Sequence, residues 1–186
     1  MTRQQLVSIG VPVLNEELNF PILISRVIPD IMLAVMMGQE RIVRNLDAKR
    51  PRQHVIDLCT GYLQYLDKAL QNLVEPPALN FGPNEVGYSV KEVIKRAKSH
   101  FNEQLSINYI ESSRYELESE QLHLDSSRAF REIHWNPKWS QDEALDRTFA
   151  WWKRVLSKPT EIKEACLEDL NRHSSTNLKK GFSHER

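Results

Sequence analysis

The sequence predicts a partial α/β fold, and three observations support this prediction. Short apolar segments rich in β-branched residues, such as residues 6–14 and 41–44, are typical of strands. Longer segments carry apolar residues at every third or fourth position, which is typical of helices. The strand segments are few in the 186-residue chain, and only six glycines occur, about half the usual share of roughly 7%. We therefore expect part of an α/β fold rather than a complete doubly wound sheet.

Charge and composition exclude several classes of partner. The chain has 25 basic and 25 acidic residues, so it is not a general polyanion binder. Residues 41–52 hold five basic residues, one acidic residue and no aromatic residue, which favours a small-anion site over a nucleic-acid surface. The longest apolar run, residues 31–37, has seven residues, well short of the roughly 20 that a membrane helix needs. Cys59 and Cys166 are too few for a disulfide framework and lack metal-ligand spacing, so we expect a reducing, cytoplasmic compartment.

The N-terminal half is expected to hold most of the strands. Gly38 is a C-cap candidate for the first helix, and Thr60 is an N-cap candidate for the second, whose leucines 63, 66, 70 and 73 form one stripe. A turn is expected at residues 82–84. The expected strands are residues 6–14, 41–44, 53–58 and 78–81, and the expected helices are residues 26–37 and 60–74.

The C-terminal half is expected to be mainly helical. Ser89 with Glu92, and Ser140 with Glu143, have the spacing of capping boxes, which predicts helices starting at these serines. Asp125 is expected to cap a short helix, and residues 171–186 are polar enough to predict disorder. The expected helices are residues 89–101, 125–133 and 140–156, with a further polar helix after Lys158, and the expected strand is residues 105–110.

Four groups of residues occur in an order and spacing that carry a family resemblance. They are Arg-Val-Ile-Pro-Asp at 26–30; residues 42–45 with Arg-Pro-Arg-Gln-His-Val at 50–55 and Gly-Tyr-Leu at 61–63; Asn-Phe-Gly-Pro at 80–83; and residues 124–129 with 135–140 and 143–145. Over about 130 residues this set resembles the C-terminal portion of the extended short-chain dehydrogenases/reductases, the NAD-dependent epimerase/dehydratase family, and among them the CDP-glucose 4,6-dehydratases.

The resemblance implies a nucleotide-sugar-binding portion without its NAD-binding half. In the family, the N-terminal half binds NAD through a Gly-x-x-Gly-x-x-Gly loop and carries a Tyr-x-x-x-Lys pair. Neither motif occurs in this sequence. We therefore expect the small C-terminal lobe of such an enzyme without its Rossmann sheet, no cofactor on this chain, and no dehydratase activity from the chain alone.

The resemblance also divides the chain into three expected parts. Residues 26–158 form the nucleotide-sugar-binding portion, and residues 159–186 form a C-terminal helix and a disordered tail. Residues 1–25 lie outside the family pattern. Within them, residues 6–17 resemble the start of a GT-A glycosyltransferase, although the later motifs of such enzymes have no counterpart here.

The resemblance assigns substrate contacts to four residues. Arg50 would grip the diphosphate of the nucleotide sugar, since a guanidinium matches paired phosphate oxygens. Arg26 would reach the diphosphate or the neighbouring sugar, and Ile42 with Arg44 would line the nucleobase pocket. For each residue the plain alternative is a solvated charge or an edge-strand position. Arg52 stands where the family usually has a tryptophan, which puts the local packing in doubt.

Two functions therefore remain open. The first is binding of a CDP-glucose-like nucleotide sugar, and the second is a non-catalytic remnant or interaction module without a retained ligand. The expected partners are the nucleotide sugar and either a separate NAD-binding polypeptide or a second copy of the chain, but no nucleic acid and no membrane. A structural role is favoured for His54, and packing is favoured for the four tryptophans at 135, 139, 151 and 152.

Overall fold

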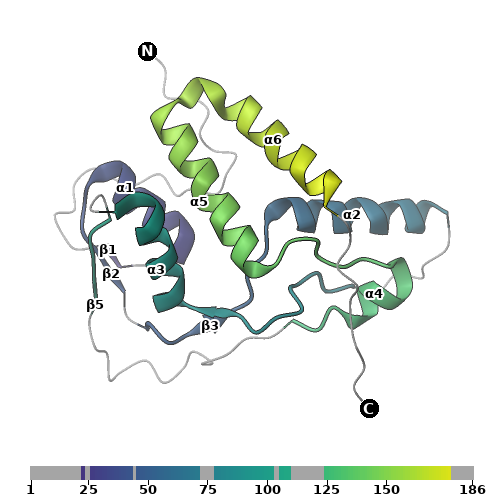
Figure 1. The fold of residues 1–186 in the computed structure, drawn as a ribbon. Coiled ribbons are helices and arrows are strands. Elements are labelled where there is room, and N and C mark those ends of the chain that lie inside the picture. The colour runs from purple at the N-terminus through teal and green to yellow at the C-terminus, as the bar shows by residue number, and fades with distance from the viewer. Residues whose placement is uncertain are drawn as a thin grey trace.

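The computed structural model describes residues 22–23, 26–43, 45–71, 78–102, 105–109 and 124–176. The predicted strand at 6–14 lies outside these residues. The structure is a mostly helical α/β arrangement (Figure 1). In chain order its elements are β1 (Ile22–Leu23), α1 (Val27–Met37), β2 (Arg41–Val43), β3 (Lys49–Arg50), α2 (Val55–Leu70), β4 (Tyr88–Ser89), α3 (Val90–Phe101), β5 (Ile107–Tyr109), α4 (Ser127–Ile133), α5 (Gln141–Ser157), the 3-10 helix Pro159–Glu161 and α6 (Ile162–Ser175).

The described strands form one small parallel sheet and one antiparallel pair. In the sheet β2 lies between β1 and β5, and Ile42 is opposite Leu23 on one side and Asn108 on the other. The antiparallel pair joins β3 to β4, with Arg50 opposite Tyr88. The predicted strands at 41–44 and 105–110 are thus confirmed in shorter form, and they pair with each other.

A first apolar core lies between the sheet and helices α1, α3 and α5. Helix α3 packs between α1 and α5 (Figure 1). Its apolar residues recur at helical spacing from Val90 to Phe101, and all of them are buried. Ile31 of α1 and Phe149 of α5 are fully enclosed beside it. The spacing of apolar residues at every third or fourth position therefore places three helices on one core.

Caps fix the ends of these helices as their sequences indicate. Gly38 ends α1 in the left-handed region at φ 61°, which a glycine adopts without a steric penalty. Ser89 and Glu92 form the predicted capping box of α3. At α5, the Ser140 hydroxyl accepts a hydrogen bond from the backbone N–H of Glu143 at 3.3 Å. The structure thus confirms the predicted starts of both helices.

A second, smaller core joins α2, α4 and the segment at 78–83. Trp135 is 2% exposed, and its ring meets that of Phe81 edge to face at a centroid distance of 4.9 Å. Gly61 of α2 lies so close that an added Cβ would be 2.6 Å from the Phe81 ring. Trp139 is also buried. These contacts confirm the packing role predicted for these two tryptophans.

The predicted start of the second helix and the strand predicted before it are wrong. Helix α2 begins at Val55, not at Thr60, and therefore replaces the strand expected at 53–58. The side chain of His54 accepts a hydrogen bond from the Ile56 N–H and so caps the earlier start. The apolar stripe used to place the helix in fact continues back through Cys59 to Val55 at helical spacing. Thr60 lies inside the helix, where its hydroxyl donates to the Asp57 carbonyl.

The strand expected at 78–81 and the disorder expected from residue 171 are also wrong in the described residues. Residues 78–83 form no strand. Next to the expected strand, the backbone of Gly82 is bonded to a side chain: Ser126 accepts from the Gly82 N–H at 2.8 Å and donates to its carbonyl at 3.1 Å. Helix α6 continues to Ser175, because Asp169 and His173 are buried against the rest of the molecule.

Asp57 connects the segments that form this second half. Its fully buried carboxylate accepts hydrogen bonds from the backbone N–H groups of Lys138 and Trp139 and from Nε2 of His173 at 2.8 Å. Its carbonyl accepts from the indole N–H of Trp135 at 3.1 Å. One residue therefore holds α2, the loop before α5 and the end of α6 together.

Membrane crossing finds no support in this arrangement. Across the described ranges, no helix is both long enough and apolar enough to span a bilayer.

Replacing Asp57 by alanine is expected to lower the free energy of unfolding by about 3 kcal/mol, because the substitution leaves buried donors without an acceptor. Urea denaturation followed by circular dichroism measures the change. The matched control is Asp67→Ala on the same helix, where the residue is exposed and its carboxylate accepts a hydrogen bond from the Gln71 side chain. The control is expected to change stability by no more than about 0.5 kcal/mol. Equal effects of the two substitutions would contradict the role assigned to Asp57.

Candidate functional site

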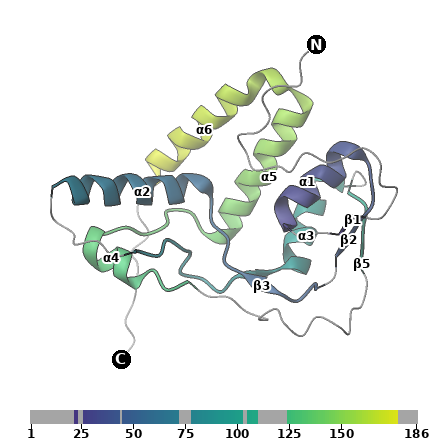
Figure 2. The same ribbon diagram turned by 180° about the vertical axis from the view of Figure 1, so that it is seen from behind.

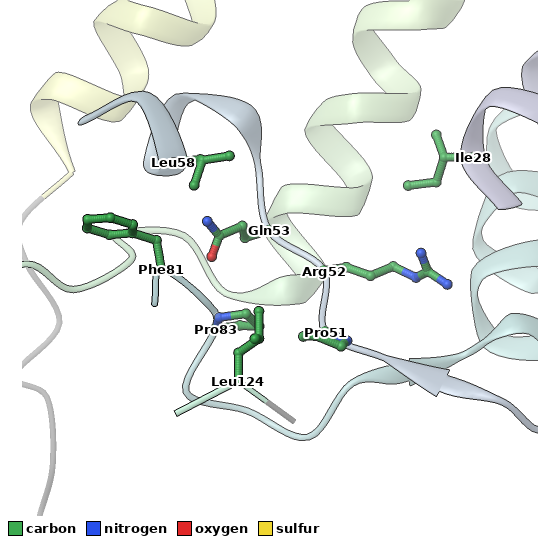
Figure 3. Close-up of a pocket in the computed structure, with 8 residues that line it drawn as sticks. All are labelled: Ile28, Pro51, Arg52, Gln53, Leu58, Phe81, Pro83 and Leu124. Atoms are coloured by element: carbon green, nitrogen blue, oxygen red, sulfur yellow. The ribbon is translucent and has the colours of Figure 1, made fainter. Parts of the chain in front are cut away.

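The candidate site is a pocket between the two cores. Its volume is about 330 Å³, which is at the lower end of the range typical of small-molecule sites. One wall comes from α1, another from the start of α2, and the segment at 78–83 forms the opposite side (Figure 3). The lining residues are Ile28, Pro51, Arg52, Gln53, Leu58, Phe81, Pro83 and Leu124.

Arg52 supplies the charge of the pocket. Its backbone N–H donates to the side-chain oxygen of Gln141 at 3.1 Å, and the amide of Gln141, itself 1% exposed, donates to the Val86 carbonyl at 2.8 Å. The guanidinium extends toward Ile28 (Figure 3). Its Nε and Nη2 are buried and have no hydrogen-bond partner in the described part of the chain. Burial lowers the pKa of Arg52, and the charge of Arg50 lowers it further.

Gln53 points the other way, toward Phe81 (Figure 3). Its Oε1 is buried and accepts no hydrogen bond from any residue that the structure describes. The surfaces next to it are apolar, since Leu58, Phe81 and Leu124 line this side. The pocket therefore has a cationic side at Arg52 and an apolar side with one amide acceptor at Gln53.

The far wall of the pocket is held in place by polar contacts. Gly82 is fixed by Ser126, and Asn84 donates to the side-chain oxygen of Asn136 at 2.6 Å. A Cβ on Gly82 would lie 2.8 Å from the Cβ of Leu124. The segments before and after α4 therefore position Phe81 and Pro83. Only a glycine fits between these two residues without displacing Leu124.

Arg50 lies directly before the pocket, at the end of β3. Its Nη1 donates to the Lys49 carbonyl at 2.9 Å, and the residue is half-buried. Gly87 lies so close to the backbone of Arg50 that a Cβ added to this glycine would be 2.3 Å from the Arg50 carbonyl carbon. The antiparallel pair of β3 and β4 thus sets the path of the chain from Arg50 to Arg52.

Two other predicted site residues, Arg26 and Ile42, lie in the described part of the chain but do not line the pocket. Arg26 is exposed at the N-cap of α1, where its N–H donates to the Asp30 carboxylate at 2.7 Å, and Ile28 of the same helix lines the pocket. Ile42 is half-buried in the central strand β2 and is not a lining residue. Arg44 lies outside the described residues.

Sequence reasoning missed three residues that shape the pocket. Arg52 was noted only as a departure from the family pattern, although it contributes the charge. Gln53 carried no signal beyond its place in the same motif. Gln141 is the first residue of α5, and only the tertiary structure shows that its amide holds the backbone of Arg52.

His54 follows the pocket and has a structural environment. The ring packs edge to face on Trp139 at 4.7 Å, and Nδ1 accepts from the Ile56 N–H at 3.3 Å. Burial lowers the pKa of His54 below its ordinary value of 6.5, and this effect outweighs the nearby carboxylates of Asp169 and Asp57, which raise it. A neutral imidazole fits the capping bond, because a protonated Nδ1 is no longer an acceptor.

The described residues do not fit a dinucleotide or a metal ion. A dinucleotide cradle needs glycines that leave space at a helix N-terminus after a strand. Gly87 precedes α3, but the backbone of Arg50 and Pro51 fills the space beside it, and Gly61 and Gly82 are closed by side chains. No group of three histidine, cysteine or acidic residues is placed to bind a metal within the described ranges.

Solved structures show the fold class. A UDP-glucose 4-epimerase from Stenotrophomonas maltophila superposes with a TM-score of 0.60 at 22% identity, covering 73% of this chain and 41% of that one. A dTDP-glucose 4,6-dehydratase from Bacillus anthracis superposes with a TM-score of 0.54 at 17% identity, covering 75% of this chain and 42% of that one. A UDP-glucuronic acid 4-epimerase from Bacillus cereus superposes with a TM-score of 0.57 at 15% identity, covering 70% of this chain and 40% of that one. The chain therefore has part of the fold of the NAD-dependent epimerases and dehydratases.

A comparison of sequences specifies the relationship further. The chain is 28% identical over 130 residues to the CDP-glucose 4,6-dehydratase of Salmonella typhimurium, a match that covers 69% of this chain and 36% of the relative. No family model matches the chain. The chain is thus partially homologous to CDP-glucose 4,6-dehydratase and spans about a third of that enzyme's length.

Lowering the pH from 7 to 5 is expected to reduce the free energy of unfolding through His54. In the unfolded chain His54 takes up a proton near pH 6.5, whereas in the folded chain it does so only at a lower pH. The unfolded state therefore binds more protons in this window. Urea denaturation across this range measures the effect. The control is His54→Asn, which keeps a capping acceptor without titrating. An equally steep pH dependence in this variant would contradict the assignment.

Proposed function

We propose that the chain is the nucleotide-sugar-binding portion of a 4,6-dehydratase, corresponding to the C-terminal lobe of the enzyme, and that its ligand is a CDP-glucose-like nucleotide sugar. The partial homology to CDP-glucose 4,6-dehydratase is the observation that carries this proposal. The pocket supports it, since two neighbouring arginines provide positive charge beside apolar walls suited to a sugar.

In this proposal each predicted residue keeps its role. Arg50 grips the diphosphate, and its position directly before the pocket supports this role. Arg26 reaches the ligand from the start of α1, while Ile42 and Arg44 contact the base. NAD and the chemistry of dehydration are assigned to polypeptide outside the described residues, either in the same protein or in a separate NAD-binding partner.

The Arg50→Ala variant is expected to bind CDP-glucose at least about tenfold more weakly, because a charged hydrogen bond to phosphate is lost. Isothermal titration calorimetry of the full chain measures this change. The matched control is Arg131→Ala on α4, whose exposed side chain contacts Ser127 away from the pocket. Unchanged affinity in the Arg50 variant would contradict the proposal. So would formation of the 4-keto-6-deoxy sugar when the chain is incubated with CDP-glucose and NAD.

One surface favours a second candidate function, that of an interaction module without a retained ligand. The outward side of α2 carries an apolar stripe whose side chains are 53–75% exposed. Asp57 and Gly61 lie on the buried side of the same helix. Helix α2 therefore exposes an apolar stripe of the kind that an ordinary surface helix turns toward the core. It lies along one edge of the molecule in both views (Figures 1 and 2). The stripe consists of Val55, Tyr62, Leu63, Leu66 and Leu70.

The second candidate predicts self-association through α2, because covering such apolar side chains is favourable by roughly 1.5 kcal/mol each. Sedimentation velocity of the wild-type chain is expected to show a dimer, which Leu66→Glu dissociates. Gln64→Glu is the matched control, since it adds the same charge about 200° away around the same helix. A wild-type chain that sediments as a monomer, or equal effects of the two variants, would contradict this function.

A further inference from the structure

The guanidinium of Arg52 has an unused edge. Its Nε and Nη2 lie along the same edge of the planar guanidinium, and both are buried without a partner among the described residues. The chain shows the usual use of this edge at Arg147, where Nε and Nη2 both donate to the buried carboxylate of Asp169. An unpaired charged donor in a buried position is costly, so an anion that pairs with it would bind favourably.

We propose that Arg52 and Gln53 make the pocket a sugar-phosphate site, in which Arg52 binds the phosphate through Nε and Nη2 and Gln53 accepts a hydrogen bond from a sugar hydroxyl. This proposal rests on the proposed function and refines it, because it names the part of the nucleotide sugar that the pocket recognises and adds a second arginine to the phosphate contacts.

The charge of the site favours phosphate over carboxylate. Arg50 lies two residues before Arg52 in the chain. Burial is the main cause of the lowered pKa of Arg52, and the positive charge of Arg50 adds to it, so two positive charges lie near each other. A single carboxylate balances one of them. A phosphate monoester such as glucose 1-phosphate carries a charge of about −1.5 to −2 at neutral pH, which balances both. In a nucleotide sugar each phosphate of the diphosphate carries one negative charge, so the two phosphates together balance both arginines. Either ligand provides two oxygens for the edge of the guanidinium.

The other side of the pocket favours a sugar next to the phosphate. The Gln53 oxygen accepts no hydrogen bond in the described part of the chain, and a phosphate dianion has no proton to give it. A sugar has hydroxyl donors together with C–H faces that pack on Phe81 and Leu58, which line this side. Because Arg52 and Gln53 point to opposite sides of the pocket (Figure 3), a ligand that contacts both carries an anion at one end and a hydrogen-bond donor at the other, as a sugar phosphate does.

Isothermal titration calorimetry of the full chain with glucose 1-phosphate tests the proposal. The wild-type chain is expected to bind saturably, and Arg52→Met is expected to weaken binding at least about tenfold. Gln53→Met is expected to weaken the binding of glucose 1-phosphate but to leave the affinity for inorganic phosphate unchanged. The matched control is Arg172→Met, an exposed arginine of α6, which is expected to bind as the wild type does. Thermal melting of Arg52→Met is expected to show no loss of stability, because the variant removes a buried charge that has no partner.

Each result decides between the two proposals. Equal affinities of the Arg52 and Arg172 variants, glucuronate binding as tightly as glucose 1-phosphate, or no binding of glucose 1-phosphate at about 10 mM would overturn the sugar-phosphate site. If CDP-glucose binds and Arg52→Met leaves that affinity unchanged, the proposed function stands without this refinement. If glucose 1-phosphate binds through Arg52 but CDP-glucose does not bind, the sugar-phosphate site stands and the proposed function fails.

Discussion

The hydrogen bonds of the Asp57 carboxylate are the contacts on which the rest of the structure depends. They join residues up to 116 positions apart and hold α2 to the loop before α5 and to the end of α6. Because a buried carboxylate requires several donors, the position of α2 is restricted to the place where these donors converge. The residues directly before α2 are Arg52, Gln53 and His54, so the same bonds also place the pocket.

The pocket therefore results from the meeting of two cores rather than from one motif. Helix α1 brings Ile28 from the first core, and the segment around Phe81 belongs to the second. Gln141, at the first turn of α5, holds the backbone of Arg52 where the two cores meet. The matches to epimerases and dehydratases give the fold, and the unpaired groups of Arg52 and Gln53 give the chemical reason to propose a ligand.

Helix α2 shows why apolar periodicity alone is an incomplete guide. Its leucine stripe predicts a helix correctly, yet the stripe lies on the outside of the described structure. Periodicity shows that a helix has an apolar side, but not which neighbour covers that side. Here the strong hydrogen bonds of Asp57 and the close packing of Gly61 turn the opposite side inward.

The sequence by itself determined the elements whose signals are local. The capping box of α3, the glycine C-cap of α1 and the buried stripe from Val90 to Phe101 follow from residues within a few positions of one another. The sequence also carried the resemblance to nucleotide-sugar dehydratases, which the partial homology confirms. Only the tertiary structure decided which side of α2 faces inward, that residues 78–83 form no strand, and that Arg52 and Gln53 line the pocket. These features depend on contacts between residues 44 to 116 positions apart, from Ser126 to Gly82 and from His173 to Asp57, which local patterns cannot encode.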